Sequence, residues 1–355
     1  MASILRRAAR KVVILALTIL WPGGISQMIR ALRTVRYREM HNLQVARPTS
    51  IPTRYLSIAA IFKDQAPNLA EWLEFHHVVG VEHVYLYDNG STDSSGTVLE
   101  PYIREGFVSV MPWAFPLNTF EAMQRLAYAH AIMNFGVHWR WMAFIDIDEF
   151  LFPVNGNSLP ATLADYESLP AVAAYWTMYG FNGHDTRPAG LTIENYTKRA
   201  PYGVQASPKS IVDPSKVIDL ESTHMFDFAE GREIAYDEQK RLVRRNDEHG
   251  PSNILRLNHY FTRSREEFAA KVARYAQIGT ARSDQKSEFA RMLEKVGTVY
   301  DDTILRFVPE VKHRLGARAG HNIKKSAASP AQGDARAKSL LDARGLHRQQ
   351  VARQR

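Results

Sequence analysis

The chain has 355 residues, of which 45% are hydrophobic and 23% charged, and its formal net charge is +8. This composition is typical of a globular protein and excludes collagen, a chain disordered throughout and a membrane protein with many spans. Cysteine is absent, which excludes disulfides, thiolate metal sites and a cysteine nucleophile, and fits a reducing compartment.

The positive charge is concentrated at the two ends of the chain. Residues 1–54 contain ten Lys or Arg and one acid, and residues 313–355 contain ten Lys or Arg and two acids. The middle, residues 55–312, has 25 basic and 34 acidic residues. Nucleic-acid binding needs a basic surface on a folded domain, so this distribution argues against it. We expect a basic amino-terminal segment over 1–54, one folded domain over 55–312, and a basic, disordered tail over 313–355.

The amino-terminal segment contains a short apolar run, residues 12–21, directly after a cluster of basic residues. These ten residues are too few to span a bilayer, which takes roughly twenty. We favour an interfacial helix on an anionic membrane surface, which predicts a cytoplasmic protein held peripherally at the inner face of the membrane. A helix packed on the domain is an equal alternative. A secretory signal peptide is the nearest formal match, but no clear cleavage site follows.

From Tyr55 onward, apolar strands alternate with helical stretches. The pattern predicts strands at 55–62, 83–87, 108–113, 141–147 and 171–181, and helices at 67–79, 94–104 and 119–135. This alternation indicates an α/β fold with a doubly wound sheet. Ligands of such sheets bind beyond the carboxyl ends of the strands, so the chemistry is expected in the loops after the first, second and fourth strands.

The strongest chemical signal is the segment Trp141–Phe150, in which an apolar strand runs into Asp146, Asp148 and Glu149. Side chains two apart on a strand point the same way, so Asp146 and Asp148 are expected to face one site. Two carboxylates suit Mn²⁺ or Mg²⁺, which would neutralise charge on a departing diphosphate. An Asp-x-Asp pair alone is a weak signal, and its position at a strand end strengthens it.

A second polar segment, Asp88–Asp93, follows the strand at 83–87. It has the composition of a turn with a helix cap, supplied by Thr92 or Asp93. At the end of a strand, Asp88 is also placed to accept a hydrogen bond from a ribose or a base. Lys63 and Asp64, at the end of the neighbouring strand, allow the same two interpretations.

These segments together resemble a GT-A glycosyltransferase, and within that group glycosyltransferase family 92 and related bacterial family-2-like proteins. The resemblance covers roughly residues 55–275, and it is the ordered set of segments that makes it specific. The matching segments are residues 61–64, 71–76, 80–83, 87–93, 124–130, 141–150, 179–184, 209–214 with His224, 258–260 and 264–271.

The resemblance implies a GT-A fold, a Rossmann-like and mostly parallel sheet flanked by helices in a single catalytic domain. It implies a metal-dependent hexosyltransferase that moves a sugar from a nucleotide sugar, with UDP favoured, to a glycan or glycolipid acceptor with inversion. Asp146, Asp148 and His259 would hold the divalent ion. The residues expected to bind the donor are Lys63, Asp64, Asp88, Asp93, Gln124 and Asp146.

The base that takes the acceptor's proton is expected in residues 183–185, with His184 and Asp185, or in residues 192–194, with Glu194, and Glu149 is a further candidate. Glu149 is the weaker one, because it is better placed to orient the metal motif. Lys209 and Arg199 are candidates for offsetting diphosphate charge, although surface lysine is the commoner explanation for Lys209. Trp139, Trp141 and Trp176 are expected in the core. Two alternative functions remain: a catalytically silent, membrane-attached protein that binds nucleotide or glycan, and another phosphate-transfer enzyme using the same carboxylates.

Overall fold

The computed structural model describes residues 52–115, 119–204, 207–220, 222–228, 235–243, 252–277 and 295–328. The short apolar run at residues 12–21 and the interfacial helix expected there lie outside these ranges. None of the helices within them is both long and apolar enough to cross a membrane. The chain divides into two compact units, residues 1–306 and 307–355.

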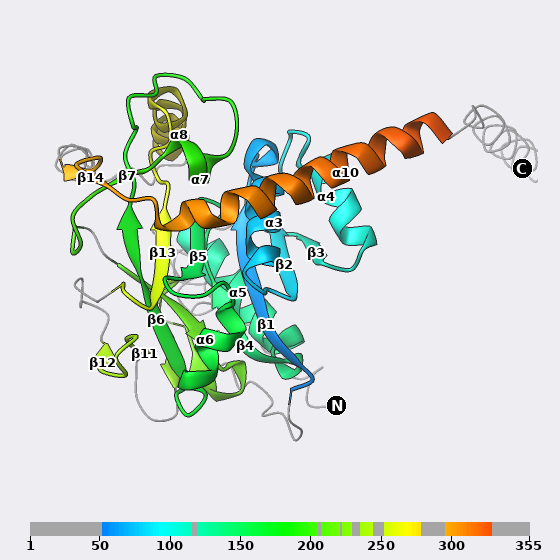
Figure 1. The fold of residues 1–355 in the computed structure, drawn as a ribbon. Coiled ribbons are helices and arrows are strands. Elements are labelled where there is room, and N and C mark those ends of the chain that lie inside the picture. Colours follow the sequence, from blue (N-terminus) through cyan, green and yellow to red (C-terminus); the bar gives the residue numbers. More distant parts are fainter. Residues whose placement is uncertain are drawn as a thin grey trace, which may run out of the picture. The chain divides into compact units, whose positions relative to one another are not determined.

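The amino-terminal half of the central sheet is parallel. Its strands lie in the order β3 (Val108–Pro112), β2 (His83–Asp88), β1 (Arg54–Phe62) and β4 (Trp139–Phe144). All four were predicted from the apolar runs. Their carboxyl ends meet at one edge of the sheet, which is where the polar loops were expected to gather (Figure 1).

The second half of the sheet mixes directions. β8 (Pro208–Val212) runs antiparallel to both β4 and β6 (Ala171–Met178). β13 (Leu255–His259) is parallel to β6 and antiparallel to β5 (Glu149–Pro153). These pairings bring chain segments more than a hundred residues apart to the carboxyl end of β4.

The remaining described strands are short. β11 (Ala235–Tyr236) and β12 (Leu242–Val243) extend the sheet beyond β6, and two separate pairs are β9 (Val217–Asp219) with β10 (Asp227–Phe228) and β7 (Lys198–Arg199) with β14 (Val299–Tyr300).

Helices cover both faces of the sheet, as the α/β prediction requires. Ala59 and Ile61 of β1 pack in one apolar cluster with α5 (Phe120–Phe135), while α3 (Ala66–Val78) and α4 (Ser95–Arg104) pack against each other on the opposite side (Figure 1). Side chains at alternate positions of a strand therefore pack in two hydrophobic cores, one on each face of the sheet. The described helices of this unit also include α6 (Leu159–Leu163), α7 (Thr192–Asn195) and α8 (Arg265–Gln277).

Trp139 and Trp141 are fully buried, which confirms their expected place in the core. A capping box precedes α8. Ser264 Oγ accepts the N–H of Glu267 at 3.2 Å, and the Glu267 carboxylate accepts the N–H of Ser264 at 3.2 Å. Both bonds satisfy backbone groups that the first turn of a helix leaves free.

The carboxyl-terminal unit contains α10 (Val308–Ala328). The expectation of disorder from residue 313 is therefore wrong for residues 313–328, and the rest of that tail lies outside the described residues. Leu315, Ala317 and Ala319 are strong helix formers interspersed with arginine, and Pro309 is compatible with a first helical turn. Low overall hydrophobicity did not prevent a helix from forming.

The buried imidazole of His76 makes the stability of the fold depend on pH. His76 is 0% exposed, its Nδ1 bonds Trp72 O at 2.8 Å, and its Nε2 accepts the Leu151 N–H at 3.3 Å. Burial lowers the pKa of His76 to about 3. In the unfolded chain the imidazole takes up a proton as pH falls below about 6.5, whereas in the folded chain it stays neutral until about pH 3. The contribution of neutral His76 to the free energy of unfolding is therefore fully present above about pH 6.5 and is lost as pH falls towards 3.

We therefore expect the stability gap between the wild type and His76→Gln to narrow by about 2 kcal/mol between pH 7 and pH 5, since each pH unit contributes about 1.4 kcal/mol. Urea unfolding of both proteins at the two pH values measures this gap. A gap independent of pH would contradict the assignment of a neutral, buried imidazole.

Candidate active site

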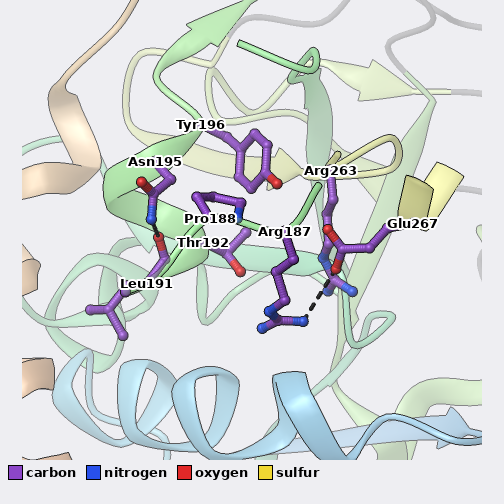
Figure 2. Close-up of a pocket in the computed structure, with 9 residues that line it drawn as sticks. Arg187, Pro188, Leu191, Thr192, Asn195, Tyr196, Arg263 and Glu267 are labelled. Carbon is purple, nitrogen blue, oxygen red and sulfur yellow. Dashed lines mark hydrogen bonds and ion pairs between the residues drawn. The ribbon is translucent and has the colours of Figure 1, made fainter. Parts of the chain in front are cut away.

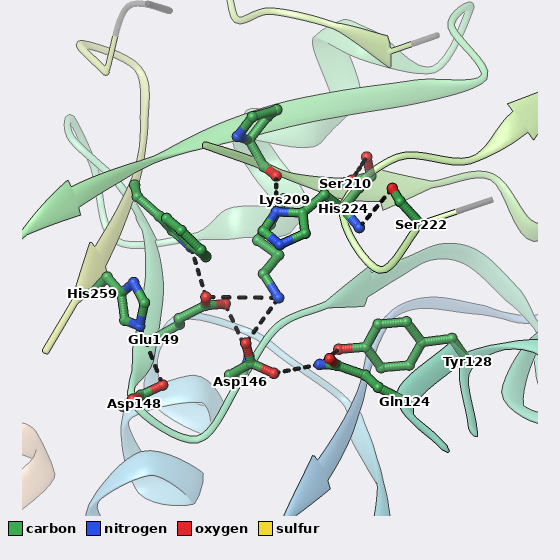
Figure 3. A network of polar contacts seen from close by, with 12 residues as sticks. Gln124, Tyr128, Asp146, Asp148, Glu149, Lys209, Ser210, Ser222, His224 and His259 are labelled. Carbon is green, nitrogen blue, oxygen red and sulfur yellow. Dashed lines mark hydrogen bonds and ion pairs between the residues drawn. The ribbon is translucent and has the colours of Figure 1, made fainter. Parts of the chain in front are cut away.

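The acidic segment after β4 forms a tight turn. β4 ends at Phe144 and β5 begins at Glu149. Glu149 Oε2 accepts the Asp146 N–H at 2.9 Å, and Asp146 O accepts the Glu149 N–H at 3.0 Å, which closes the turn. The expectation that Asp146 and Asp148 extend from one face of a strand is therefore wrong. The turn directs the two carboxylates to different partners (Figure 3).

The Asp146 carboxylate is held on both of its oxygens. Oδ1 accepts a hydrogen bond from Gln124 Nε2 at 2.6 Å, and Oδ2 accepts one from Lys209 Nζ at 2.9 Å. Gln124 also donates to the hydroxyl of buried Tyr128 at 2.8 Å. The Asp146 side chain remains 30% exposed, so a fixed carboxylate borders solvent at the sheet edge.

Glu149 lies beneath this turn and is 0% exposed. Its Oε1 accepts a hydrogen bond from Trp176 Nε1 at 2.6 Å, and Lys209 Nζ lies 3.8 Å from the same oxygen. Burial raises the pKa of Glu149 to about 8, although the charge of Lys209 opposes the shift. Both oxygens are engaged by donors of the protein, so the carboxyl group supports the turn from within.

Lys209 projects from β8 into this cluster and is 2% exposed. Burial would lower its pKa, but the neighbouring Asp146 and Glu149 carboxylates outweigh burial and raise it above the ordinary value. Lys209 is therefore a buried, charged lysine, and the expectation of a surface lysine is wrong. Burial and the nearby Lys209 lower the pKa of His224 to about 4, so this imidazole is neutral beside the charged amine.

Asp148 has its own pair of partners on the other side of the turn. Oδ2 accepts a hydrogen bond from Lys271 Nζ at 2.6 Å, and Oδ1 lies 3.5 Å from His259 Nε2. Burial alone would raise the pKa of Asp148, but Lys271 and His259 outweigh burial and hold it well below the ordinary value. The carboxylate is therefore ionised at neutral pH.

His259 ends β13 and is 5% exposed. Its ring packs on the Trp176 indole with 4.5 Å between the ring centroids, and its Nδ1 has no hydrogen-bond partner in the described part of the chain. Burial lowers the pKa of His259, although Asp148 opposes that shift. A neutral imidazole thus faces the Asp148 carboxylate through Nε2.

The cluster fits a divalent ion in part. Among the described residues, no group of three or more His, Asp or Glu side chains is arranged to hold a metal ion. Asp148 Oδ1 and His259 Nε2, 3.5 Å apart, are nevertheless donors of the kinds that Mn²⁺ accepts, and both face the same space. Asp146 fits less well, because each of its oxygens already accepts a hydrogen bond.

The residues expected to bind a nucleoside lie close together but bond mainly to the backbone. Asp64 Oδ1 accepts the Thr92 N–H at 2.7 Å and the Asp93 N–H at 3.2 Å, while Asp93 caps the first turn of α3 at the Ala66 N–H, 2.9 Å away. Asp88 closes its own turn by accepting the Ser91 N–H at 2.8 Å. The turn interpretation is therefore confirmed, and the β1 and β2 loops are locked to each other.

Lys63, next to this pair of loops, is exposed. The Asp93 carboxylate also accepts the Ser95 N–H at 3.0 Å, at the start of α4. The Asp93 carboxylate therefore accepts backbone N–H groups at the first turns of two helices, α3 and α4. Its role as a donor-binding residue stays a prediction, as does that of Lys63.

Of the remaining candidate bases, His184 and Asp185 lie in the loop before α7, and Glu194 lies in α7, where it accepts the Leu191 N–H at 3.0 Å. The Asp185 side chain is exposed and pairs with Arg265 at 3.2 Å. His184 is half-buried, bonds Asn195 O through Nε2 at 3.3 Å and packs edge-on against Tyr196. The backbone carbonyls of both residues accept N–H groups from the start of α8. Their catalytic role stays a prediction.

Two residues of the cluster escaped sequence reasoning. Trp176 was assigned to the core but donates to Glu149 and packs against the tilted ring of His259, and Lys271 was not singled out but binds Asp148. Lys271 lies inside a segment that supported the family resemblance, which was the available signal. For Trp176 the sequence offered none, since buried and site-lining tryptophans look alike.

The family model described as Glycosyltransferase family 92 matches residues 55–292. A family 92 protein of Arabidopsis thaliana is 32% identical over 196 residues, which are 50% of this chain and 32% of the relative. A family 92 protein of Oryza sativa subsp. japonica is 25% identical over 229 residues, 62% of this chain and 36% of the relative. The chain thus spans about a third of the length of these curated relatives.

Solved structures give weaker likenesses. Staphylococcus aureus TarS, residues 1–349 in complex with UDP, has a TM-score of 0.31 and 15% identity, over 45% of this chain and 47% of that one. The mannosyltransferase PcManGT of Pyrobaculum calidifontis, in complex with GDP-Man and Mn²⁺, has a TM-score of 0.26 and 17% identity, over 46% of each chain.

Proposed function

Because the chain belongs to glycosyltransferase family 92, we propose that it transfers a sugar from a nucleotide sugar to the hydroxyl of a glycan or glycolipid acceptor. We take UDP as the nucleotide and inversion as the stereochemical course, as the family resemblance implies. The observation that carries the proposal is the ionised Asp148 facing the neutral His259 at 3.5 Å, beside Asp146, at the carboxyl edge of the sheet.

Asp148 and His259 are the residues that would hold a divalent ion. Such an ion, when bound, supplies positive charge where the diphosphate leaves. Asp146 lies next to this pair but is oriented by Lys209 and Gln124, which suits it to the donor's sugar or ribose hydroxyls. Glu149 holds the turn and is a positioning residue, because both of its oxygens are occupied by Trp176 and by the Asp146 N–H.

Attachment to an anionic membrane through residues 1–54 stays part of the proposal. Of residues 1–54, the structure describes the last three positions, and the basic cluster lies outside the described ranges. A liposome sedimentation assay that compares the full chain with a version starting at Tyr55 tests it. Equal sedimentation of the two would remove the membrane from the proposal.

The donor is tested by thermal denaturation with UDP-, GDP- and CMP-sugars, each with and without Mn²⁺. A ligand that binds only the folded state raises its stability, by about 2.7 kcal/mol at a hundred times its dissociation constant. We expect an increase of several degrees with a UDP-sugar and Mn²⁺ together. Mn²⁺ alone and UMP, which lacks the second phosphate, are the controls. No response to any pair would favour a catalytically silent binding protein.

A further inference from the structure

A small pocket lies between the loop at residues 187–196 and the start of α8 (Figure 2). It is a shallow pocket, and its empty space together with the adjoining open solvent is about 180 Å³. Its lining includes Pro188 and Leu191 and the polar residues Arg187, Tyr196, Arg263 and Glu267. None of the residues expected to bind the donor or the metal belongs to this lining.

Arg263 is the most unusual residue of the pocket. Its backbone φ is +48°, it is 9% exposed, and its Nε has no hydrogen-bond partner. Its Nη2 donates to Ile147 O at 3.4 Å, the residue before Asp148. Within the described ranges no carboxylate forms a direct ion pair with it, although the charges of Asp148, Glu267 and Glu71 act on it from farther away. A buried guanidinium that no carboxylate contacts directly is only partly compensated, and an anion bound beside it would complete the compensation.

Tyr196 presents a second unsatisfied donor. It is 2% exposed, and its hydroxyl has no hydrogen-bond partner among the described residues. The hydroxyl of nearby Ser264 is committed to the Glu267 carboxylate at 2.8 Å. Buried tyrosine hydroxyls ordinarily find a partner, so this one points to a missing acceptor. His184 packs against the edge of the same ring.

The charges around the pocket leave room for an added negative charge. Arg187 donates to Pro67 O at 2.8 Å and pairs with Glu267 at 3.2 Å. Glu267 is the one carboxylate among the lining residues, against two arginines. Glu71 lies below, where it accepts the N–H groups of Thr192 at 2.8 Å and of Ile193 at 3.0 Å, and burial raises its pKa.

We propose that Arg187, Arg263 and Tyr196 form a subsite for a carboxylate or phosphate group carried by the acceptor. This inference rests on the proposed function and names the chemical class of its second substrate: an acidic or phosphorylated glycan. The subsite adjoins the reaction centre through the Arg263–Ile147 contact, and its lining excludes the loops that hold Asp64 and Asp88.

Binding of two small anions tests the subsite directly. Glucuronic acid and inorganic phosphate are titrated into the full chain and followed by isothermal titration calorimetry. Glucose, the uncharged counterpart of glucuronic acid, is the control ligand. Wild type is expected to bind both anions and not glucose. Tyr196→Phe removes only an unpartnered hydroxyl, so we expect about tenfold weaker binding at an unchanged melting temperature. Tyr300→Phe, at an exposed tyrosine, is the control.

Arg263→Met supplies the second readout. An arginine with a purely structural role would lose stability on replacement, whereas an unpaired buried charge is removed without loss. We expect this variant to keep its melting temperature, to lose anion binding, and to retain the response to UDP with Mn²⁺.

Several outcomes would overturn the subsite. One is a wild type that responds to UDP and Mn²⁺ but binds neither anion; another is anion binding that both variants leave unchanged. Loss of the UDP response in the variants would assign the pocket to the donor and overturn its link to the acceptor. If the wild type binds the anions but its stability does not change with any nucleotide sugar, the result contradicts the proposed function. The assignment of the pocket to an acceptor would then fail as well.

Discussion

Replacing Asp148 by asparagine is expected to weaken Mn²⁺-dependent binding of UDP and to lower sugar transfer by roughly 10²–10³-fold, the loss typical when one group that stabilises developing charge is removed. The physical reason is that the neutral amide keeps the shape of the side chain but no longer supplies the ionised oxygen that faces His259 at 3.5 Å. Calorimetric titration of UDP with and without Mn²⁺ measures the binding, and release of UDP from the donor measures transfer.

Asp185→Asn is the matched control for this change. Asp185 is an exposed carboxylate whose ion pair is with Arg265, so the same substitution there is expected to leave metal-dependent binding within about twofold. Thermal unfolding separates loss of the fold from loss of the ion, since Asp148 also pairs with Lys271. An Asp148→Asn protein that is folded and still binds UDP only with Mn²⁺ would show that the ion is held elsewhere.

Much of this site follows from local sequence, and the rest depends on long-range pairing. The positions of β1, β2 and β4 were predictable because each is a continuous apolar run, and the polar loops had to follow them. The acidic turn was located correctly for the same reason. Its geometry was not, because the Asp146–Glu149 hydrogen bonds end the strand two residues before Asp146, and a local pattern of alternating acids does not show that.

The burial of Lys209 shows what local patterns omit. A lysine in a short strand is usually at the surface, and only the insertion of β8 between β4 and β6 places this one under the acidic turn. The same holds for His259, which β13 brings beside Trp176 of β6. Residue types indicate which chemistry is available; the order of strands in the sheet decides which charges meet.

Replacing Lys209 by methionine should lower the free energy of unfolding by about 3 kcal/mol, because it leaves the Asp146 carboxylate, beside buried Glu149, without its buried cation. Urea unfolding of the variant measures the loss. Lys216→Met is the control, since Lys216 is partly exposed and lies 3.8 Å from Asp213. Surface pairs of this kind contribute less than about 1 kcal/mol.

The double variant Lys209→Met/Asp146→Asn separates charge from packing. Methionine matches the unbranched stem of lysine. If Lys209 served mainly to fill space, Lys209→Met would lower the free energy of unfolding by less than about 1.5 kcal/mol. The losses caused by Lys209→Met and by Asp146→Asn would then simply add in the double variant. If Lys209 is the counter-charge of the turn, removing the Asp146 charge should recover part of the lost stability, with a coupling of about 1–3 kcal/mol. Strict additivity would therefore refute the role of Lys209 as the internal cation and leave the orientation of Asp146 to Gln124 alone.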